Sequence, residues 1–244
     1  MKLPRSVPIS LAICAALSVG AFLGARHVAT SSAQAPPPSL RASTIELHVP
    51  HAAGSIVLDG DTDDPGWQKV VARTGPLLTS SGAPARPYSD ARVVWGDGHL
   101  YFALYAADED IRATNKTPDA PLWLEDAFQM VFTSGSTTKT LDVSPLGIVT
   151  DGVRVGSGPF DYAWQSGAHV SYELDGTAND SRDEDEEWVI EIAIPFESLG
   201  MRGERGERIG LSLRRCDTPK GGTRVCASWG SGDLGDAAGV LVLD

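Results

Sequence analysis

The stretch Glu187–Gly200, EWVIEIAIPFESLG, determines the fold expected for this chain. Successive side chains of a β-strand point to opposite faces, so alternate residues share one face. One face is bulky and apolar, and consists of Trp188, Ile190, Ile192 and Ile194. The opposite face carries Val189, Glu191 and Ala193 and is half apolar. A strand that is largely apolar on both faces is typical of the interior of a sandwich, so we expect a central strand.

The end of this strand is also marked in the sequence. Pro195 has no backbone N–H and cannot continue the hydrogen-bond ladder. Residues 196–200, FESLG, then predict one short helical turn that is closed by Gly200.

The rest of the chain has the composition of an all-β protein. Among 244 residues there are 26 Gly, 16 Pro and only 3 Met, which favours short strands joined by tight turns. Strands are expected over residues 44–49, 91–95, 99–107, 123–133, 138–144, 147–155, 160–174, 187–195, 207–215, 224–229 and 240–243. Residues 97–98, Asp-Gly, predict a tight hairpin turn. Together these segments predict a two-sheet antiparallel β-sandwich of the jelly-roll type, with one or two short helical turns.

One such helical turn is expected after a short strand at residues 56–58. Asp64 is a suitable N-cap, and Pro65 suits the first turn of a helix that ends near Ala72. Trp67 should face the core from this turn.

The N-terminus has the layout of an export signal. Lys2 and Arg5 precede an apolar run over residues 8–24, and small residues follow it. The run is also close to the length of a membrane-spanning helix, so an uncleaved anchor is the alternative. We therefore expect a signal peptide or membrane anchor at 1–35, a linker at 36–45 and one domain at 46–244 that is periplasmic or secreted.

The charge of the chain restricts its partners. The net charge is −12, and residues 1–35 contain three basic residues and no acidic one, so the remainder carries −15. Such a surface repels nucleic acid and anionic lipid, so neither is an expected partner, and membrane contact is expected only through an uncleaved anchor. Neutral ligands and cations remain suitable.

Two cysteines remain outside the N-terminal segment. Cys216 and Cys226 flank a turn-rich stretch between two strand-like segments, so a hairpin would bring them face to face. In an oxidising compartment this predicts a disulfide, with two reduced buried thiols as the alternative.

The motifs of common enzymes are missing from the sequence. It has no nucleophile elbow, no His-Glu-x-x-His and no phosphate-binding loop, so a non-catalytic protein is expected. Asp59, Asp61 and Asp63 alternate like the start of a calcium loop, although the twelfth position is Val70 instead of glutamate. A structural calcium ion held by these oxygens is one interpretation, and a solvated acidic turn is the other.

Tryptophan supplies the clearest candidate for ligand contact. Sugars stack their C–H faces on flat rings, while their hydroxyls need amides and carboxylates. Trp123 is expected at a loop mouth beside Glu125 and Asp126, with Gln129 on the same face of its strand. Trp164 and Trp229 also lie near expected strand ends, and for every tryptophan a place in the core is the alternative.

Six segments, in order, resemble the motifs of a family 9 carbohydrate-binding module within the DOMON-like superfamily. They are residues 56–67 (IVLDGDTDDPGW), 91–102 (ARVVWGDGHLYF), 123–132 (WLEDAFQMVF), 175–177 (DGT), 188–195 (WVIEIAIP) and 209–213 (IGLSL). The resemblance covers residues 46–244. It implies a β-sandwich that binds sugars without cleaving them, often with calcium.

The resemblance also implies roles for single residues. Two tryptophans clamp a sugar in sugar-binding members of the family, and Trp123 stands where one of them is expected. Gln129 replaces a frequent Glu, Ser144 replaces a frequent Asn, and the loop after Trp229 lacks the second aromatic.

The leading hypothesis is therefore an exported, non-catalytic module that binds carbohydrate or a glycan surface. The residues expected to contact the ligand are Trp123, Glu125, Asp126, Gln129, Ser144, Trp164 and Trp229. An envelope structural or interaction module without a small ligand is the main alternative. A haem-binding electron-transfer domain is a third hypothesis, with axial ligands drawn from Met130, Met201, His99 and His169.

Overall fold

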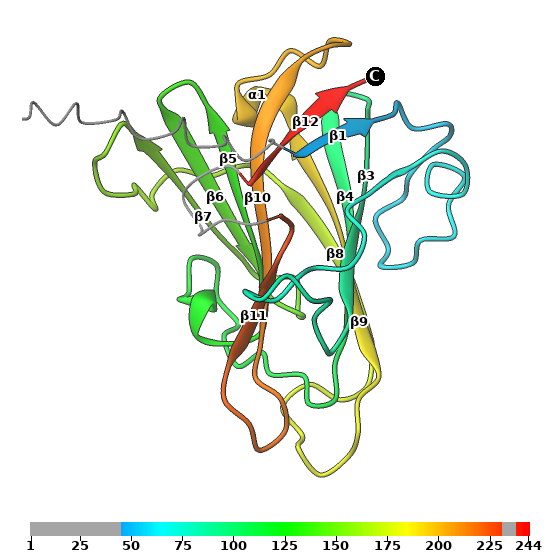
Figure 1. Cartoon of the computed structure of the whole chain (residues 1–244), viewed down its shortest axis with the longest axis vertical. Coiled ribbons are helices and arrows are strands. Elements are labelled where there is room, and N and C mark those ends of the chain that lie inside the picture. Colours follow the sequence, from blue (N-terminus) through cyan, green and yellow to red (C-terminus); the bar gives the residue numbers. More distant parts are fainter. Residues whose placement is uncertain (1–44, 231–237) are drawn as a thin grey trace, which may run out of the picture. The chain divides into compact units, whose positions relative to one another are not determined.

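Two β-sheets that pack face to face form the computed structural model, which describes residues 45–230 and 238–244 (Figure 1). The first sheet has the order β1 (Ile45–Val49), β12 (Gly239–Leu243), β10 (Arg208–Asp217), β5 (Ala127–Ser134), β6 (Thr137–Val143) and β7 (Val149–Val155), with β11 (Val225–Ser228) paired to β10. The second has the order β2 (Ala72–Arg73), β3 (Ser89–Gly96), β4 (His99–Ala107), β9 (Glu187–Pro195) and β8 (His169–Asp175). Every pair is antiparallel except β1 with β12, so the predicted all-β sandwich is confirmed.

The expected signal or anchor at 1–35 and most of the linker lie outside the described residues. Among the residues that the structure does describe, no helix has the length and apolar character to cross a membrane.

Strand β9 is central, as its sequence predicts. It pairs with β4 on one side and β8 on the other. All four of its predicted core side chains are fully buried, namely Trp188, Ile190, Ile192 and Ile194. Burial of each such side chain stabilises the fold by about 1.5–3 kcal/mol, so this strand anchors the core. The helical turn after it, α1 (Phe196–Leu199), ends at Gly200 with a φ of 77°, also as predicted.

Two further local predictions are confirmed. The hairpin of β3 and β4 turns at Asp97 and Gly98, whose φ angles of 46° and 81° are both positive, as a type I′ turn requires. Cys216 and Cys226 lie opposite each other on β10 and β11 and form a disulfide.

The predicted helix near residues 64–72 is wrong, and so is the strand at 56–58. Residues 64–70 form turns in which the N–H of Gly66 bonds to Ser55 O, 3.0 Å away, instead of continuing a helix. The buried carboxylate of Glu191 on β9 accepts hydrogen bonds from the backbone of Gly60 and from Nε1 of Trp67, at 2.9 and 2.7 Å. This distant acceptor fixes the loop over the outer face of β9 and buries Trp67, which confirms the expected burial of that ring.

Two predicted strands are too long. Residues 122–124 form a short 3-10 helix, η1 (Leu122–Leu124), so the strand predicted from Trp123 begins only at Ala127. Pro121 precedes η1 with a φ of −74°, and the N–H of Glu125 bonds back to Leu122 O, which turns the chain. The strand predicted over 160–174 is limited to β8, because residues 156–168 form a loop that folds back along β7.

A buried ion pair connects the two sheets at one end of the sandwich. Arg215 on β10 places Nη2 2.7 Å from Oδ2 of Asp108, which directly follows β4, and 3.1 Å from Oδ1 of Asp217. Nε1 of Trp188 on β9 donates to the same Asp108 oxygen at 2.9 Å. Because all four side chains are buried, loss of the guanidinium would leave unpaired carboxylates inside the protein.

Arg215→Ala is therefore expected to lower the free energy of unfolding by about 3–5 kcal/mol. Arg208→Ala, which removes an exposed pair with Glu46, should have little effect on stability because solvent screens that pair. Urea denaturation of both variants measures the difference, and equal losses would contradict the role assigned to Arg215.

Candidate functional site

The outer face of the first sheet carries a pocket of about 230 Å³ over β5, β6 and β7. It is lined by Trp123, Gln129, Val131, Thr140, Asp142, Arg154, Phe160 and Tyr162. The strand register explains the floor, because Gln129 lies opposite Asp142 and Val131 opposite Thr140. The alternate residues of β5, such as Met130, point into the core. The same alternation that builds the core therefore presents a polar floor outward.

Trp123 stands at the rim of this pocket. Its neighbour Leu122 is fully buried and fixes η1 against the domain, while the Trp123 side chain is 43% exposed. The Trp123 ring lies 6.2 Å from the ring of Tyr162, centre to centre. A tryptophan held in this way offers a flat surface to a ligand.

Two further aromatic rings come from the loop at residues 156–162. Asp161 exchanges backbone hydrogen bonds of 2.8 and 3.0 Å with Val153 on the free edge of β7, which fixes the loop there. Gly152 allows the Tyr162 ring to lie on β7, because a Cβ at position 152 would be 3.0 Å from that ring. Phe160 follows at 6.0 Å from Tyr162. We call Trp123, Tyr162 and Phe160 the aromatic row.

Hydrogen bonds hold the polar floor in place. Nε2 of Gln129 donates to Oδ2 of Asp142 at 2.9 Å, and Nε of Arg214 donates to Oε1 of Gln129 at 2.9 Å. Oγ1 of Thr140 lies 3.4 Å from Oδ1 of Asp142. Burial raises the pKa of Asp142 to about 6, although its bond to Gln129 acts in the opposite direction. The floor is thus ordered before any ligand binds.

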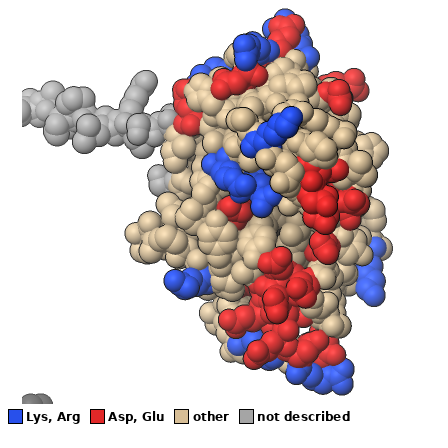
Figure 2. Space-filling model, turned by 90° about the vertical axis from the view of Figure 1, so that its right-hand side faces the viewer, with Lys and Arg blue, Asp and Glu red and all other residues tan. Residues whose placement is uncertain are grey.

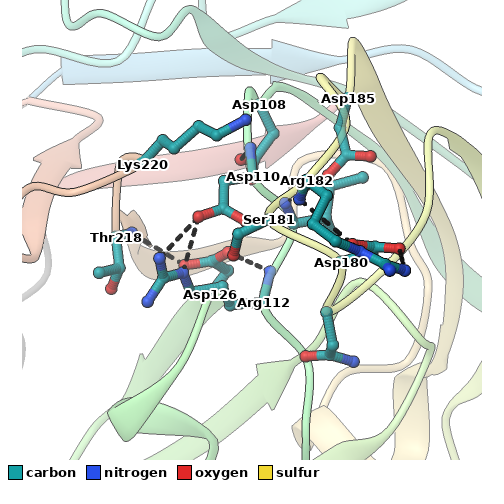
Figure 3. Close-up of polar contacts among 12 residues, drawn as sticks. Asp108, Asp110, Arg112, Asp126, Asp180, Ser181, Arg182, Asp185, Thr218 and Lys220 are labelled. Carbon is teal, nitrogen blue, oxygen red and sulfur yellow. Dashed lines mark hydrogen bonds and ion pairs between the residues drawn. The ribbon is translucent and has the colours of Figure 1, made fainter.

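The two acids beside Trp123 bond within the protein. Glu125 accepts the backbone N–H groups of Thr114 and Asn115, at 2.7 and 3.1 Å. Asp126 is fully buried and accepts the N–H groups of Arg112 and Thr218, at 2.7 and 2.9 Å (Figure 3). Both carboxylates therefore fix the loops that support η1.

The remaining predicted ligand residues lie away from the pocket lining. Ser144 is buried, and its Oγ accepts the N–H of Ile148 in the turn between β6 and β7. Trp164 packs against the main core beneath Lys139, and Trp229 is buried within that core. Of the seven residues proposed from sequence, the pocket brings together Trp123 and Gln129.

The carboxylates suggested as calcium ligands are exposed. Asp59, Asp61 and Asp63 lie on the surface loop before Trp67, where Oδ1 of Asp59 accepts the N–H of Asp61. Within residues 45–230 and 238–244, one group of three carboxylates has oxygens within 4.8 Å of one another, and it consists of Asp108, Asp126 and Asp217. The guanidinium of Arg215 bonds two of these three and acts as their counter-ion.

Comparisons with known proteins identify the fold. No protein-family model and no curated protein matches the chain by sequence. A proposed carbohydrate-binding protein from Bacteroides uniformis matches in structure with a TM-score of 0.64 and 13% identity, over 83% of this chain and 100% of its own. A family 9 carbohydrate-binding module from Caldicellulosiruptor kristjanssonii matches with a TM-score of 0.55 and 17% identity. The match covers 82% of this chain, and 94% of the module bound to cellotriose or 96% of the module bound to glucose.

This chain shares its fold with a family 9 carbohydrate-binding module. The sandwich expected from the resemblance is thus the fold of these solved proteins. At identities of 13% and 17% the likeness extends to the fold alone, so the ligand of this chain must be inferred from its own residues.

Most of the residues that line the pocket over β5, β6 and β7 were not predicted from the sequence. Asp142, Arg154, Phe160 and Tyr162 were not among the predicted residues. Asp142 alternates with the apolar Leu141 and Val143, which was a visible signal for an outward polar position. Nothing in the sequence indicated that Tyr162 would lie beside Trp123, because that contact depends on how the loop folds over β7.

Three buried carboxylates should make stability depend on pH. Burial, with repulsion from Asp108, raises the pKa of Asp126 to about 7, and burial raises the pKa values of Asp142 and Asp217 to about 6. A folded-state pKa above the unfolded value means that folding takes up protons. The stabilisation is therefore complete below the unfolded pKa of 3.8 and is lost as pH rises to about 7.

We expect the free energy of unfolding to fall between about pH 4 and pH 7, with each unit of pKa difference worth about 1.4 kcal/mol. Urea denaturation at a series of pH values measures this slope. Asp126→Asn removes the largest of the three titrations and should flatten the slope. An unchanged slope in that variant would refute the assignment to Asp126.

Proposed function

We propose that this domain is an exported, non-catalytic module that binds carbohydrate in the pocket over β5, β6 and β7. The observation that carries the proposal is the aromatic row standing beside an ordered polar floor. Sugar rings stack on aromatic faces through their C–H groups, and their hydroxyls form hydrogen bonds with fixed polar side chains. The pocket supplies both kinds of contact.

The polar floor would recognise hydroxyl groups. Gln129 already uses its Nε2 for Asp142 and its Oε1 for Arg214, so its orientation is fixed. The Asp142 carboxylate has further acceptor capacity for a sugar hydroxyl beyond its bonds to Gln129 and Thr140. Groups ordered before binding lose little entropy when the ligand arrives, which favours affinity.

Binding without cleavage is favoured by the carboxylates of the pocket. Glycoside hydrolysis ordinarily uses two carboxyl groups on either side of the scissile bond. Among the described residues that line the pocket, Asp142 is the one carboxylate. The family 9 module with this fold has been solved in complex with cellotriose and with glucose, which supports a sugar as ligand here.

Export is supported by the disulfide. The bond between Cys216 and Cys226 belongs in an oxidising compartment, such as a periplasm or the cell exterior. This fits the signal-like N-terminus expected from the sequence.

Loss of an aromatic ring from the row should abolish most of the affinity. Trp123→Ala and Tyr162→Ala are each expected to weaken sugar binding about 30-fold, because an anchoring ring is worth about 2 kcal/mol or more. Isothermal titration calorimetry against glucose, cellotriose and a panel of other oligosaccharides measures the loss. Tyr172→Ala is a matched control, since Tyr172 is 44% exposed and Tyr162 42%, but Tyr172 lies on β8 of the other sheet.

Two results would overturn the proposal. One is equal loss of binding in the Tyr172 control, which would place the ligand elsewhere. The other is no heat with any saccharide, which would favour the alternative of an envelope interaction module without a small ligand.

Calcium binding at Asp59, Asp61 and Asp63 stays a prediction. A bound ion would stabilise the folded state, so chelation should lower the melting temperature and calcium should restore it. Differential scanning calorimetry with Asp61→Asn/Asp63→Asn as the comparison tests the site. A melting temperature that does not change when the chelator is added would refute calcium binding at this site.

A further inference from the structure

One residue of the pocket has a charge that the proposed recognition of neutral sugars does not use. Arg154 lies on β7, where its guanidinium carbon is 4.6 Å from the centre of the Phe160 ring. Its Nε–H is buried and, within the described part of the chain, has no hydrogen-bond partner. A half-buried cation with an unused donor is a candidate for contact with an anionic ligand.

The carboxylate of the pocket does not neutralise Arg154. In the ladder, Arg154 lies opposite Thr138, whereas Asp142 lies opposite Thr150. The two charged residues are thus four positions apart along the strands, or about 13 Å at the usual rise per residue. Asp142 is also bonded to Gln129 and lies in the field of Arg214 and Arg224.

The setting of Arg154 contrasts with the other sheet. On the side of the molecule that carries β3, β4, β8 and β9, acidic side chains gather in large groups, with a smaller group of Lys and Arg among them (Figure 2). Beside β8 and β9, for example, a groove is lined by Glu173, Asp175 and Glu187. An anionic ligand would be repelled from that groove, whereas the aromatic row with Arg154 beside Phe160 offers a favourable place for one.

We propose that the pocket takes an acidic saccharide, with the carboxylate of a uronic acid on Arg154 and the sugar rings along the aromatic row. This inference rests on the proposed function and adds the class of sugar. A guanidinium is planar and presents parallel N–H donors that match a carboxylate, and hydrogen bonds between charged groups exceed neutral ones in strength. Phe160 beneath the guanidinium keeps it in position for this contact.

The row also sets a minimum length for the ligand. Trp123 and Phe160 are at its two ends, with ring separations of 6.2 Å and 6.0 Å on either side of Tyr162. We therefore expect a ligand that touches both Trp123 and Arg154 to contain at least two sugar residues. The uronic acid lies at the Phe160 end.

The test compares ligands in which the carboxyl group is either charged or neutralised as a methyl ester. Isothermal titration calorimetry on the full chain would use a trisaccharide of galacturonic acid and its methyl ester, and the corresponding pair from glucuronic acid. The acid is expected to bind at least about 10-fold more tightly than its ester, with the difference shrinking at high salt. Arg154→Gln should remove this preference by weakening binding of the acid more than binding of the ester, and Arg154→Lys should keep part of it.

Controls separate the possible outcomes. Arg205→Gln removes the same charge from an exposed site elsewhere and should leave the preference intact. Equal binding of acid and ester by the natural chain, or an unchanged preference in Arg154→Gln, would overturn the inference while the proposed function stands. Failure of every saccharide to bind would overturn both. If a trisaccharide that carries sulfate esters and no carboxylate binds more tightly than the uronic acids, the inference of a uronic acid is overturned and the group bound by Arg154 is a sulfate.

Discussion

The buried contact of Arg215 with Asp108 is the interaction on which the arrangement of the sheets depends. Arg215 belongs to one sheet, Trp188 belongs to the other, and Asp108 directly follows β4 of that second sheet; none of the three is exposed to solvent. From this contact a series of bonds leads toward the pocket. Arg215 also bonds Asp217, the next residue Thr218 donates its N–H to Asp126, and Asp126 follows the short helix that carries Trp123. The position of the exposed ring is thus tied to the interior.

The two acidic residues beside the exposed Trp123 were expected to contact a sugar, but their carboxylates accept hydrogen bonds from backbone amides instead. Glu125 and Asp126 each accept two or more N–H groups from neighbouring loops, which is a common way to satisfy donors where regular structure ends. The polar groups that face the pocket come instead from the outward positions of β5 and β6. The residues next to Trp123 in the sequence are therefore not the residues that lie beside the exposed face of its ring.

Local patterns made the fold largely predictable from the sequence. Alternation gave the buried face of β9, Asp97 and Gly98 gave the hairpin turn, and the turn between Cys216 and Cys226 gave the disulfide. The rest depended on contacts between distant residues. Glu191 holds a loop more than 120 residues away and prevents the expected helix there. Tyr162 reaches Trp123 only because a loop folds over Gly152, and no local pattern encodes that event.

The loop at residues 156–162 has a second consequence, for solubility. Strand β7 is the last strand of its sheet, and an uncovered edge strand offers free N–H and C=O groups to which another chain can add. Asp161 occupies both backbone groups of Val153 at that edge. The segment that supplies Tyr162 and Phe160 thereby also blocks edge-to-edge aggregation. Shortening it would expose the backbone hydrogen-bonding groups of β7 as well as remove two aromatic rings.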